Sequence, residues 1–95
     1  MKRRPACVDS SAEYNNGPDV IVAMVTSRRS RLQNPEIGDV VIGHWQEAGL
    51  PLESVVRTDR LLVLEQRLLS LTLGELRPDD LEAVDEAMLA VLGLA

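Results

Sequence analysis

The chain contains 95 residues, of which 45% are apolar, and it carries a net charge of −5. This length and composition predict a single folded domain over residues 1–95 and exclude a disordered chain. They also exclude a membrane span and a signal peptide, because the longest apolar run covers only residues 20–25 and no apolar stretch follows the basic start. The lone cysteine, Cys7, cannot form an internal disulfide, so we expect a protein of a reducing cytoplasm.

The charge is divided unevenly along the chain. Residues 1–74 carry nine basic and nine acidic side chains, whereas residues 75–95 carry six acidic side chains and one arginine. The negative excess therefore falls on the C-terminal segment. The rest of the chain is left able to present an arginine-lined face to a polyanion such as nucleic acid.

The first part of the chain predicts two strands separated by a turn. Residues 6–8 form a short extended piece, and residues 10–18 are polar and end in the turn sequence Asn-Asn-Gly-Pro. Residues 20–25 are mostly β-branched and flanked by breakers, which is typical of a strand buried on both faces. Residues 26–38 are polar and rich in arginine, and we expect them to form a mobile loop.

The middle of the chain predicts further short strands. The three candidates are residues 39–42, 54–56 and 61–64. Residues 44–51 indicate a turn or a single helical turn, because glycine and proline interrupt them. Residues 69–73 alternate leucine with other residues as a strand does, although a short helix around residues 68–69 fits equally well.

The clearest predicted element is a helix that begins at Pro78 and ends at Gly93. Proline suits the first helical position, and the two aspartates that follow complement the positive end of the helix dipole. Apolar residues recur every three or four positions as one stripe, formed by Leu81, Val84, Met88 and Leu92. The whole pattern predicts the α+β class, with roughly five short strands in a small, strongly bent antiparallel sheet or SH3-like barrel and one C-terminal helix.

Three short sequences place phosphate-binding or proton-handling side chains at the ends of strand-like segments. They are Arg4-Pro5, Thr26-Ser27 and the run Ser-Val-Val-Arg-Thr-Asp at residues 54–59. In this order, and followed by LRPDDLEAVDEAMLAVLGL, they resemble the MazF/PemK/Kid family of bacterial toxin ribonucleases over nearly the whole chain. The resemblance implies a MazF/CcdB-like fold and an RNA-cutting activity that uses no metal.

The resemblance also implies a role for each motif. Arg4 matches the arginine that holds the scissile phosphate, and Thr26 matches a threonine whose hydroxyl stabilises the transition state. Ser27 would lie beside it in the RNA groove. Arg57 and Asp59 match an Arg-x-Asp pair that some members use as general acid and general base.

The chemistry of RNA cleavage supports a role for these residue types independently of the family resemblance. RNA supplies its own nucleophile, the 2′-hydroxyl, so an enzyme need only remove its proton and stabilise charge on the phosphate. A carboxylate such as Asp59 can accept the proton, arginines can bind two phosphate oxygens, and a hydroxyl can complete the site. The products would be a 2′,3′-cyclic phosphate and a free 5′-hydroxyl. We expect no cofactor and no metal, because one histidine and one cysteine make no ligand cluster.

Two groups of these residues also have a simpler interpretation. Arg57 and Asp59 lie two positions apart on a strand and point to the same face, so they could be a surface ion pair with no catalytic role. Arg28, Arg29 and Arg31 could bind RNA or a protein partner, or they could lie on a solvated loop.

The resemblance implies partners as well as chemistry. We expect single-stranded RNA as substrate, a small cognate antitoxin as inhibitor, a homodimer, and a location in the bacterial cytoplasm. Family members usually have a strand and a loop before the Arg-Pro pair, and this chain has only residues 1–3 there. An alternative is therefore a catalytically silent module that only binds the antitoxin. A topoisomerase poison on the same fold, as in CcdB toxins, ranks last because the C-terminal end is unlike theirs.

Overall fold

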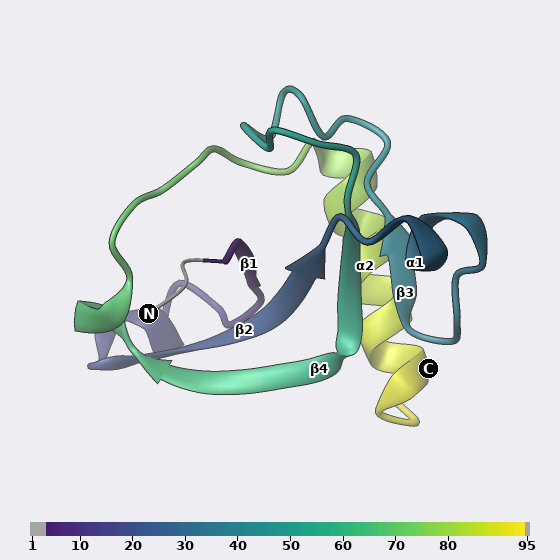
Figure 1. Ribbon diagram of the computed structural model, residues 1–95. Coiled ribbons are helices and arrows are strands. Elements are labelled where there is room, and N and C mark those ends of the chain that lie inside the picture. Colours follow the sequence, from purple (N-terminus) through teal and green to yellow (C-terminus); the bar gives the residue numbers. More distant parts are fainter. Residues whose placement is uncertain (1–3, 95) are drawn as a thin grey trace.

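The computed structural model describes residues 4–94 of the chain (Figure 1). Two α-helices lie in this range, α1 (Arg29–Gln33) and α2 (Pro78–Val91), and single 3-10 turns cover Tyr14–Asn16 and Gln66–Leu68. The same range contains four strands, which are β1 (Ala6–Val8), β2 (Asp19–Thr26), β3 (Asp39–Val41) and β4 (Val55–Glu65).

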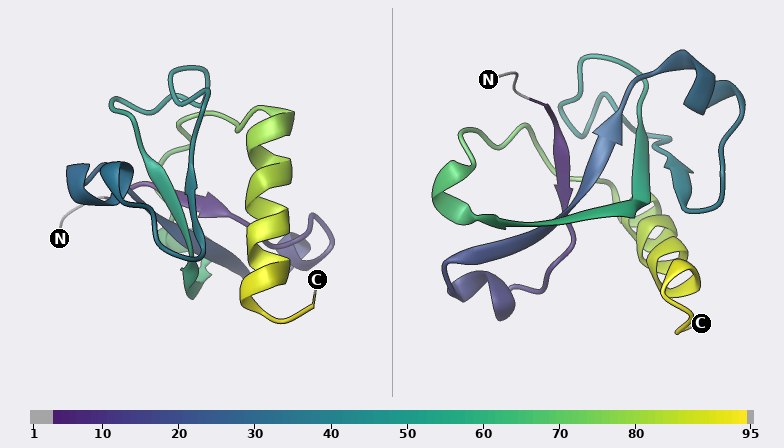
Figure 2. Two further views of the ribbon diagram at one scale, coloured as in Figure 1. Left: turned by 90° about the vertical axis from the view of Figure 1, so that its right-hand side faces the viewer. Right: turned by 60° about the horizontal axis from the view of Figure 1, so that its bottom comes forward.

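The four strands form one antiparallel sheet in the order β1-β2-β4-β3. The sheet curls, and α2 packs against β3 and β4 (Figure 1). The left view of Figure 2 shows α1 on the other side of these strands from α2. The predicted α+β fold, a bent antiparallel sheet with a C-terminal helix, is confirmed. None of the described helices is long and apolar enough to cross a membrane.

The sharpest bend lies in β4, where the sequence predicted two separate strands. Residues 61–65 pair with the first half of β2 and residues 55–57 pair with its end, but residues 58–60 have no partner in β2. The backbone remains extended through this interruption, so β4 is one strand that turns a corner (Figure 1). Thr58 holds the corner, because its N–H and its hydroxyl both donate to the carbonyl of Gly38, at 2.9 and 2.7 Å.

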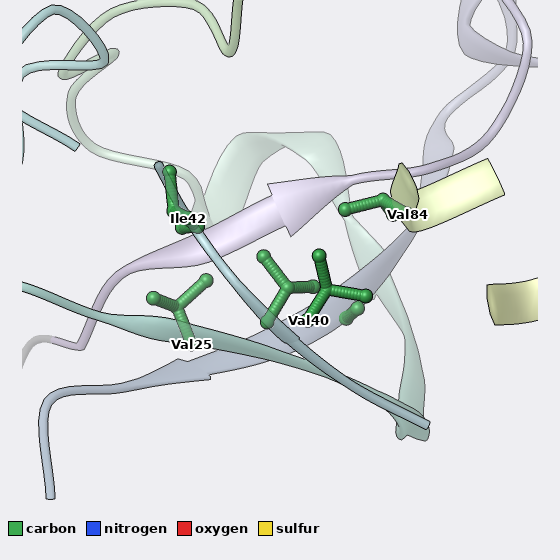
Figure 3. Close-up of a cluster of buried hydrophobic side chains, with 6 residues drawn as sticks. Val25, Val40, Ile42 and Val84 are labelled. Carbon is green, nitrogen blue, oxygen red and sulfur yellow. The ribbon is translucent and has the colours of Figure 1, made fainter. Parts of the chain in front are cut away.

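The core lies between the sheet and α2 and is built from aliphatic side chains (Figure 3). Trp45 packs at its edge and is only partly buried. Each fully buried valine or isoleucine stabilises the fold by about 1.5–3 kcal/mol relative to exposure. The buried cluster consists of Ala23, Val25, Val40, Ile42, Val56 and Val84.

Helix α2 begins at Pro78 as predicted, but its buried face differs from the predicted stripe. Val84 is fully buried and Met88 packs on the core, whereas Leu81 and Leu92 are exposed. The reason is Asp80, which turns inward. Its two carboxylate oxygens accept hydrogen bonds from the N–H groups of residues 43 and 44, at 2.9 and 2.8 Å. The helix is therefore rotated so that this carboxylate, and not Leu81, faces the interior.

One further prediction is wrong and another is only partly right. The arginine-rich segment contains the short helix α1 and is not a loop throughout. The leucine-rich segment, residues 69–73, is not a strand, because no strand pairs with it, and of the alternative short helix only Leu68 lies in a 3-10 turn, which ends there. It ends where its backbone crosses the loop before β4, and a Cβ atom on Gly49 would lie 2.0 Å from the carbonyl oxygen of Leu73. Gly49 has φ +81°, so both the crossing and the backbone conformation require glycine.

Candidate functional site

A groove of about 540 Å³ lies where the end of β2, helix α1 and the corner of β4 meet. Arginines dominate its lining. They come from three separate parts of the chain, because the strand order places the last residues of β2 beside β4 and α1 follows β2 directly. We call this the basic groove; among its lining residues are Arg4, Thr26, Arg28, Arg31, Arg57 and Arg60.

The end of β2 brings the first two sequence motifs together. The carbonyl of Pro5 accepts a hydrogen bond from the N–H of Val25 at 3.4 Å, which fixes the Arg4-Pro5 pair beside the last residues of β2. Arg4 and Thr26 consequently line the same groove. The hydroxyl of Thr26 accepts a hydrogen bond from the N–H of Arg28 at 3.2 Å, and this leaves its proton free to be donated to a ligand.

A second hollow, of about 310 Å³, adjoins the basic groove and shares Arg4, Val25 and Thr26 with it. Ser27 lines this second hollow and not the basic groove. Its other walls are mostly apolar and come from the loop before β4, except for one residue that precedes β1. These walls are formed by Pro5, Leu50, Pro51, Leu52 and Ser54.

A buried carboxylate, Asp39, lies behind the groove at the start of β3. Its side chain is 0% exposed. Nη2 of Arg31 donates to Oδ1 at 3.1 Å, and Nε of Arg31 lies 3.1 Å from Oδ2 without the alignment of a hydrogen bond. Desolvation lowers the pKa of Arg31, but the hydrogen bond and the charge of Asp39 outweigh it, so the pKa is raised overall. The N–H of Glu36 also donates to Asp39, at 2.9 Å.

Arg57 lies directly across the sheet from Asp39, in the ladder between β3 and β4. Its Nε is 4.0 Å from an oxygen of Asp39 and 3.9 Å from an oxygen of Asp59. That Nε atom is buried without a hydrogen-bond partner, although 23% of the side chain is exposed and lines the groove. The predicted Arg57–Asp59 pair therefore exists only as a long contact, and Asp59 does not line either hollow.

The structure separates the other predicted arginines. Arg28 and Arg31 line the basic groove, but Arg29 on α1 lines neither hollow. Within residues 4–94, Arg31 is paired with two carboxylates, whereas Arg4, Arg28 and Arg60 form no ion pair.

Sequence analysis missed Arg60 and Asp39. Arg60 reaches the groove only because β4 turns its corner there, and no local pattern signals that corner. Asp39 had a visible signal, since it is a charged residue at the first position of an apolar strand candidate. The histidine, His44, pairs with Asp79 at 3.1 Å, and neither residue lines the basic groove. In the described part of the chain, no three His, Cys, Asp or Glu residues are grouped as metal ligands.

The fold has many solved counterparts. A MazE-MazF complex from Deinococcus radiodurans is 28% identical, with TM-score 0.78, over 98% of this chain and 88% of that one. A mycobacterial endoribonuclease in complex with its cognate antitoxin is 25% identical, with TM-score 0.81, over 97% of this chain and 82% of that one. The Mycobacterium tuberculosis toxin MazF-mt6 shares the fold at 22% identity, with TM-score 0.81, over 97% of this chain and 88% of that one. No match was found among curated proteins.

The sequence itself carries the family pattern. Residues 1–92 match the profile of the PemK-like, MazF-like toxin of type II toxin-antitoxin systems. This match spans the strands, the basic groove and α2, so it covers every element described above. The chain therefore belongs to the PemK/MazF toxin family of type II toxin–antitoxin systems.

Proposed function

We propose that this chain is an endoribonuclease toxin that cuts single-stranded RNA without a metal, leaving a 2′,3′-cyclic phosphate and a 5′-hydroxyl. The observation that carries the proposal is the meeting of Arg4, Thr26 and Arg57 in one basic groove, from three distant parts of the sequence. Two guanidinium groups and a hydroxyl suit a phosphate whose oxygens gain negative charge during the reaction.

The reaction requires attack of the 2′-oxygen on phosphorus, with loss of its proton to a base, and breaking of the bond from phosphorus to the 5′-oxygen, which gains a proton from water in the open groove. Arg4 and Arg57 hold the phosphate oxygens, and Thr26 donates its free hydroxyl proton to the same oxygens. Asp59 accepts the proton of the 2′-hydroxyl; its side chain is 39% exposed and lies 3.9 Å from Nε of Arg57, a residue that lines the groove. Arg28 and Arg60 attract neighbouring phosphates of the strand.

A second exposed carboxylate competes with Asp59 for the role of base. Glu36 lines the basic groove, and its side chain is 69% exposed while it pairs with Arg31 at 3.2 Å. Glu36 lines the groove and Asp59 lies next to Arg57, so the variants Asp59→Asn and Glu36→Gln distinguish the two carboxylates. We expect the larger loss of cleavage in Asp59→Asn.

The remaining proposals concern assembly and regulation. Solved relatives with the same fold were crystallised with antitoxins, such as MazE in Deinococcus radiodurans. We propose that this chain likewise forms a homodimer in the bacterial cytoplasm and is inhibited there by a small cognate antitoxin. The arginine-lined groove and the acidic C-terminal segment offer such a partner surfaces of opposite charge.

The decisive experiment is cleavage of a long RNA by the purified protein in EDTA. We expect discrete cuts whose new 5′ ends accept phosphate from a polynucleotide kinase without prior phosphatase treatment. Arg57→Ala and Thr26→Val should each reduce the rate by about 10²–10³-fold. The matched control is Arg67→Ala, because Arg67 is an exposed arginine paired with Glu65 outside the groove.

A substrate with a single deoxynucleotide at a mapped cut adds a chemical control. It should resist cutting there alone, since it lacks the nucleophile. If the folded protein makes no cuts in any RNA, the enzyme proposal is wrong. A silent antitoxin-binding module is then the better description, and binding of a cognate antitoxin would support it.

A further inference from the structure

We propose that Asp39 is a positioning residue that holds Arg57 in its reactive orientation, and that it controls the rate of RNA cleavage more than the binding of RNA. The inference rests on the proposed function, because it assigns a task to a residue behind the same groove. Asp39 does not line the basic groove and makes its contacts from behind it, so it acts through Arg57.

The first argument is the burial and charge balance of Asp39. Its side chain is fully buried, and a buried carboxylate is stable only when paired and hydrogen-bonded. Arg31 and the N–H of Glu36 supply these partners. Their fixed geometry makes Asp39 a rigid negative charge, unlike Asp59, whose side chain is 39% exposed and is screened by water.

The second argument is the position of Arg57 in the sheet. Arg57 is paired with Asp39 of β3 and with Met24 of β2, and it is the last residue paired on both sides before β4 turns its corner. Beyond it, residues 58–60 have no partner in β2. The backbone of Arg57 is thus fixed, but the orientation of its long side chain needs a separate constraint.

The third argument is the environment of the Arg57 guanidinium. Its Nε is buried and has no hydrogen-bond partner, and Asp39 and Asp59 lie at nearly equal distances of 4.0 and 3.9 Å. Of the two, only Asp39 is shielded from water, so its attraction for the buried Nε is the stronger. This attraction draws Nε inward and leaves the other atoms of the side chain as the part that lines the groove.

The role of Arg31 changes as a consequence. Sequence analysis considered Arg31 for binding RNA or a protein partner, but its guanidinium is already engaged by Asp39 and Glu36. We assign to it the task of fixing Asp39. Removing Arg31 should therefore resemble removing the charge of Asp39, and it should differ from removing Arg28, which has no ion pair with the described residues.

The test compares Asp39→Asn with the wild type in steady-state cleavage of a defined RNA. Asparagine keeps the shape of the side chain and removes its charge. We expect kcat to fall about 10²-fold, as for a misplaced reacting group, while KM changes little. The control is Asp9→Asn, a partly buried carboxylate outside the groove, which should retain full activity.

A double-mutant cycle separates positioning from a general loss of structure. If Asp39 acts through Arg57, then adding Asp39→Asn to the Arg57→Ala variant should lower kcat by less than about threefold. Thermal melting and circular dichroism establish that each variant is folded. A folded Asp39→Asn variant with the wild-type kcat overturns the proposal. So does an equally large fall in kcat when Asp39→Asn is added to the Arg57→Ala variant.

A measurement without activity keeps this proposal distinct from the proposed function. The Nε–H signal of Arg57 in the nuclear magnetic resonance spectrum should exchange slowly with water, because this atom is buried. Asp39→Asn should shift the signal and accelerate its exchange, while Asp59→Asn should leave it nearly unchanged. If the wild type cuts no RNA, only the proposed function fails. An Arg57 signal that responds to Asp59→Asn and not to Asp39→Asn overturns the positioning role in either case.

Discussion

Two buried carboxylates, Asp39 and Asp80, serve the molecule in different ways. Asp80 accepts hydrogen bonds from two backbone N–H groups and forms no ion pair within residues 4–94. Asp39 is contacted by two arginine side chains, Arg31 and Arg57. The charge of Asp80 therefore fixes the path of the chain, whereas the charge of Asp39 fixes other side chains. Substitution of Asp80 should affect stability, and substitution of Asp39 should affect activity.

The surroundings of the two carboxylates differ in the same sense. Near Asp80, the loop before β4 is tied to the start of α2 and crossed by the leucine-rich segment, with no room for an added methyl group at Gly49 or Gly74. Near Asp39, the groove is open and three of its arginines have no ion pair within the described residues. Rigid packing and unpaired charge are thus separated within one small domain, and the following substitutions test this separation.

The largest effect is expected for Gly49→Ala. The positive φ alone costs about 1–3 kcal/mol for a non-glycine residue, and the new Cβ would lie 2.0 Å from the carbonyl oxygen of Leu73. We expect a loss of about 4 kcal/mol or more in the free energy of unfolding, measured with denaturant at one protein concentration. The matched control is Gly93→Ala, where φ is +74° but nothing lies within 4 Å. Equal losses at the two positions would contradict the backbone crossing.

Asp80→Ala should produce the next largest effect. It leaves the N–H groups of residues 43 and 44 without their acceptors, and the cost is about 3 kcal/mol in the free energy of unfolding. Asp80→Asn should cost less, because its amide oxygen still accepts one of the two hydrogen bonds. The neighbouring variant Asp79→Ala is the control, since Asp79 is exposed and contacts the side chain of His44. An equal loss in the free energy of unfolding for Asp80→Ala and Asp79→Ala would contradict the structural role of Asp80.

A smaller effect is expected for Thr58→Val, which tests the corner of β4. Valine keeps the volume but loses the hydroxyl that donates to the carbonyl of Gly38 at 2.7 Å. That carbonyl still accepts the N–H of residue 58, so the loss should be about 1 kcal/mol in the free energy of unfolding. Because the corner also places Arg57 and Arg60, we expect a simultaneous decrease in RNA cleavage. A stable variant with full cleavage would show that the hydroxyl does not hold the corner.

The sequence predicts those parts of the fold and site that depend on local patterns. Strand β2 follows from its β-branched run, and the start of α2 follows from Pro78 with its two aspartates. Arg4 and Thr26 meet because one precedes β1 and the other ends β2, and a simple antiparallel pair brings these positions together. Arg4 and Thr26, which the sequence placed at the ends of strand-like segments, therefore both line the basic groove.

The sequence does not predict contacts that depend on register or on packing of distant segments. The Asp39–Arg57 pairing requires the register between β3 and β4, and Arg60 reaches the groove through a corner at which β4 has no partner in β2. The leucine-rich segment has the period of a strand, but a strand needs a partner and the sheet offers none. Leu81 is exposed because a polar residue, Asp80, finds better hydrogen bonds inside.

The smallest predicted effect concerns pH and contrasts two exposed or half-exposed carboxylates. Burial raises the pKa of Asp9, the nearby charge of Asp85 adds to this, and a hydrogen bond from Cys7 at 3.3 Å only partly opposes it. A raised pKa means that the folded state holds the proton more tightly, so the contribution of Asp9 to stability is present below its unfolded pKa and is lost as pH rises through its folded pKa. For Asp79 the hydrogen bond to His44 lowers the pKa, so its contribution is present above the unfolded pKa and is lost as pH falls.

We therefore expect Asp9→Asn to raise the free energy of unfolding at pH 7 relative to the wild type, by less than about 1 kcal/mol because water screens this carboxylate. The gain should disappear below the unfolded pKa of Asp9, since both side chains are then neutral. Asp79→Asn should show the opposite pattern, with a loss at pH 7 that vanishes in acid. Thermal melts between pH 3 and pH 7 would follow both differences. A stability difference for Asp9→Asn that is the same at every pH would mean that packing, and not the charge of the carboxylate, determines it.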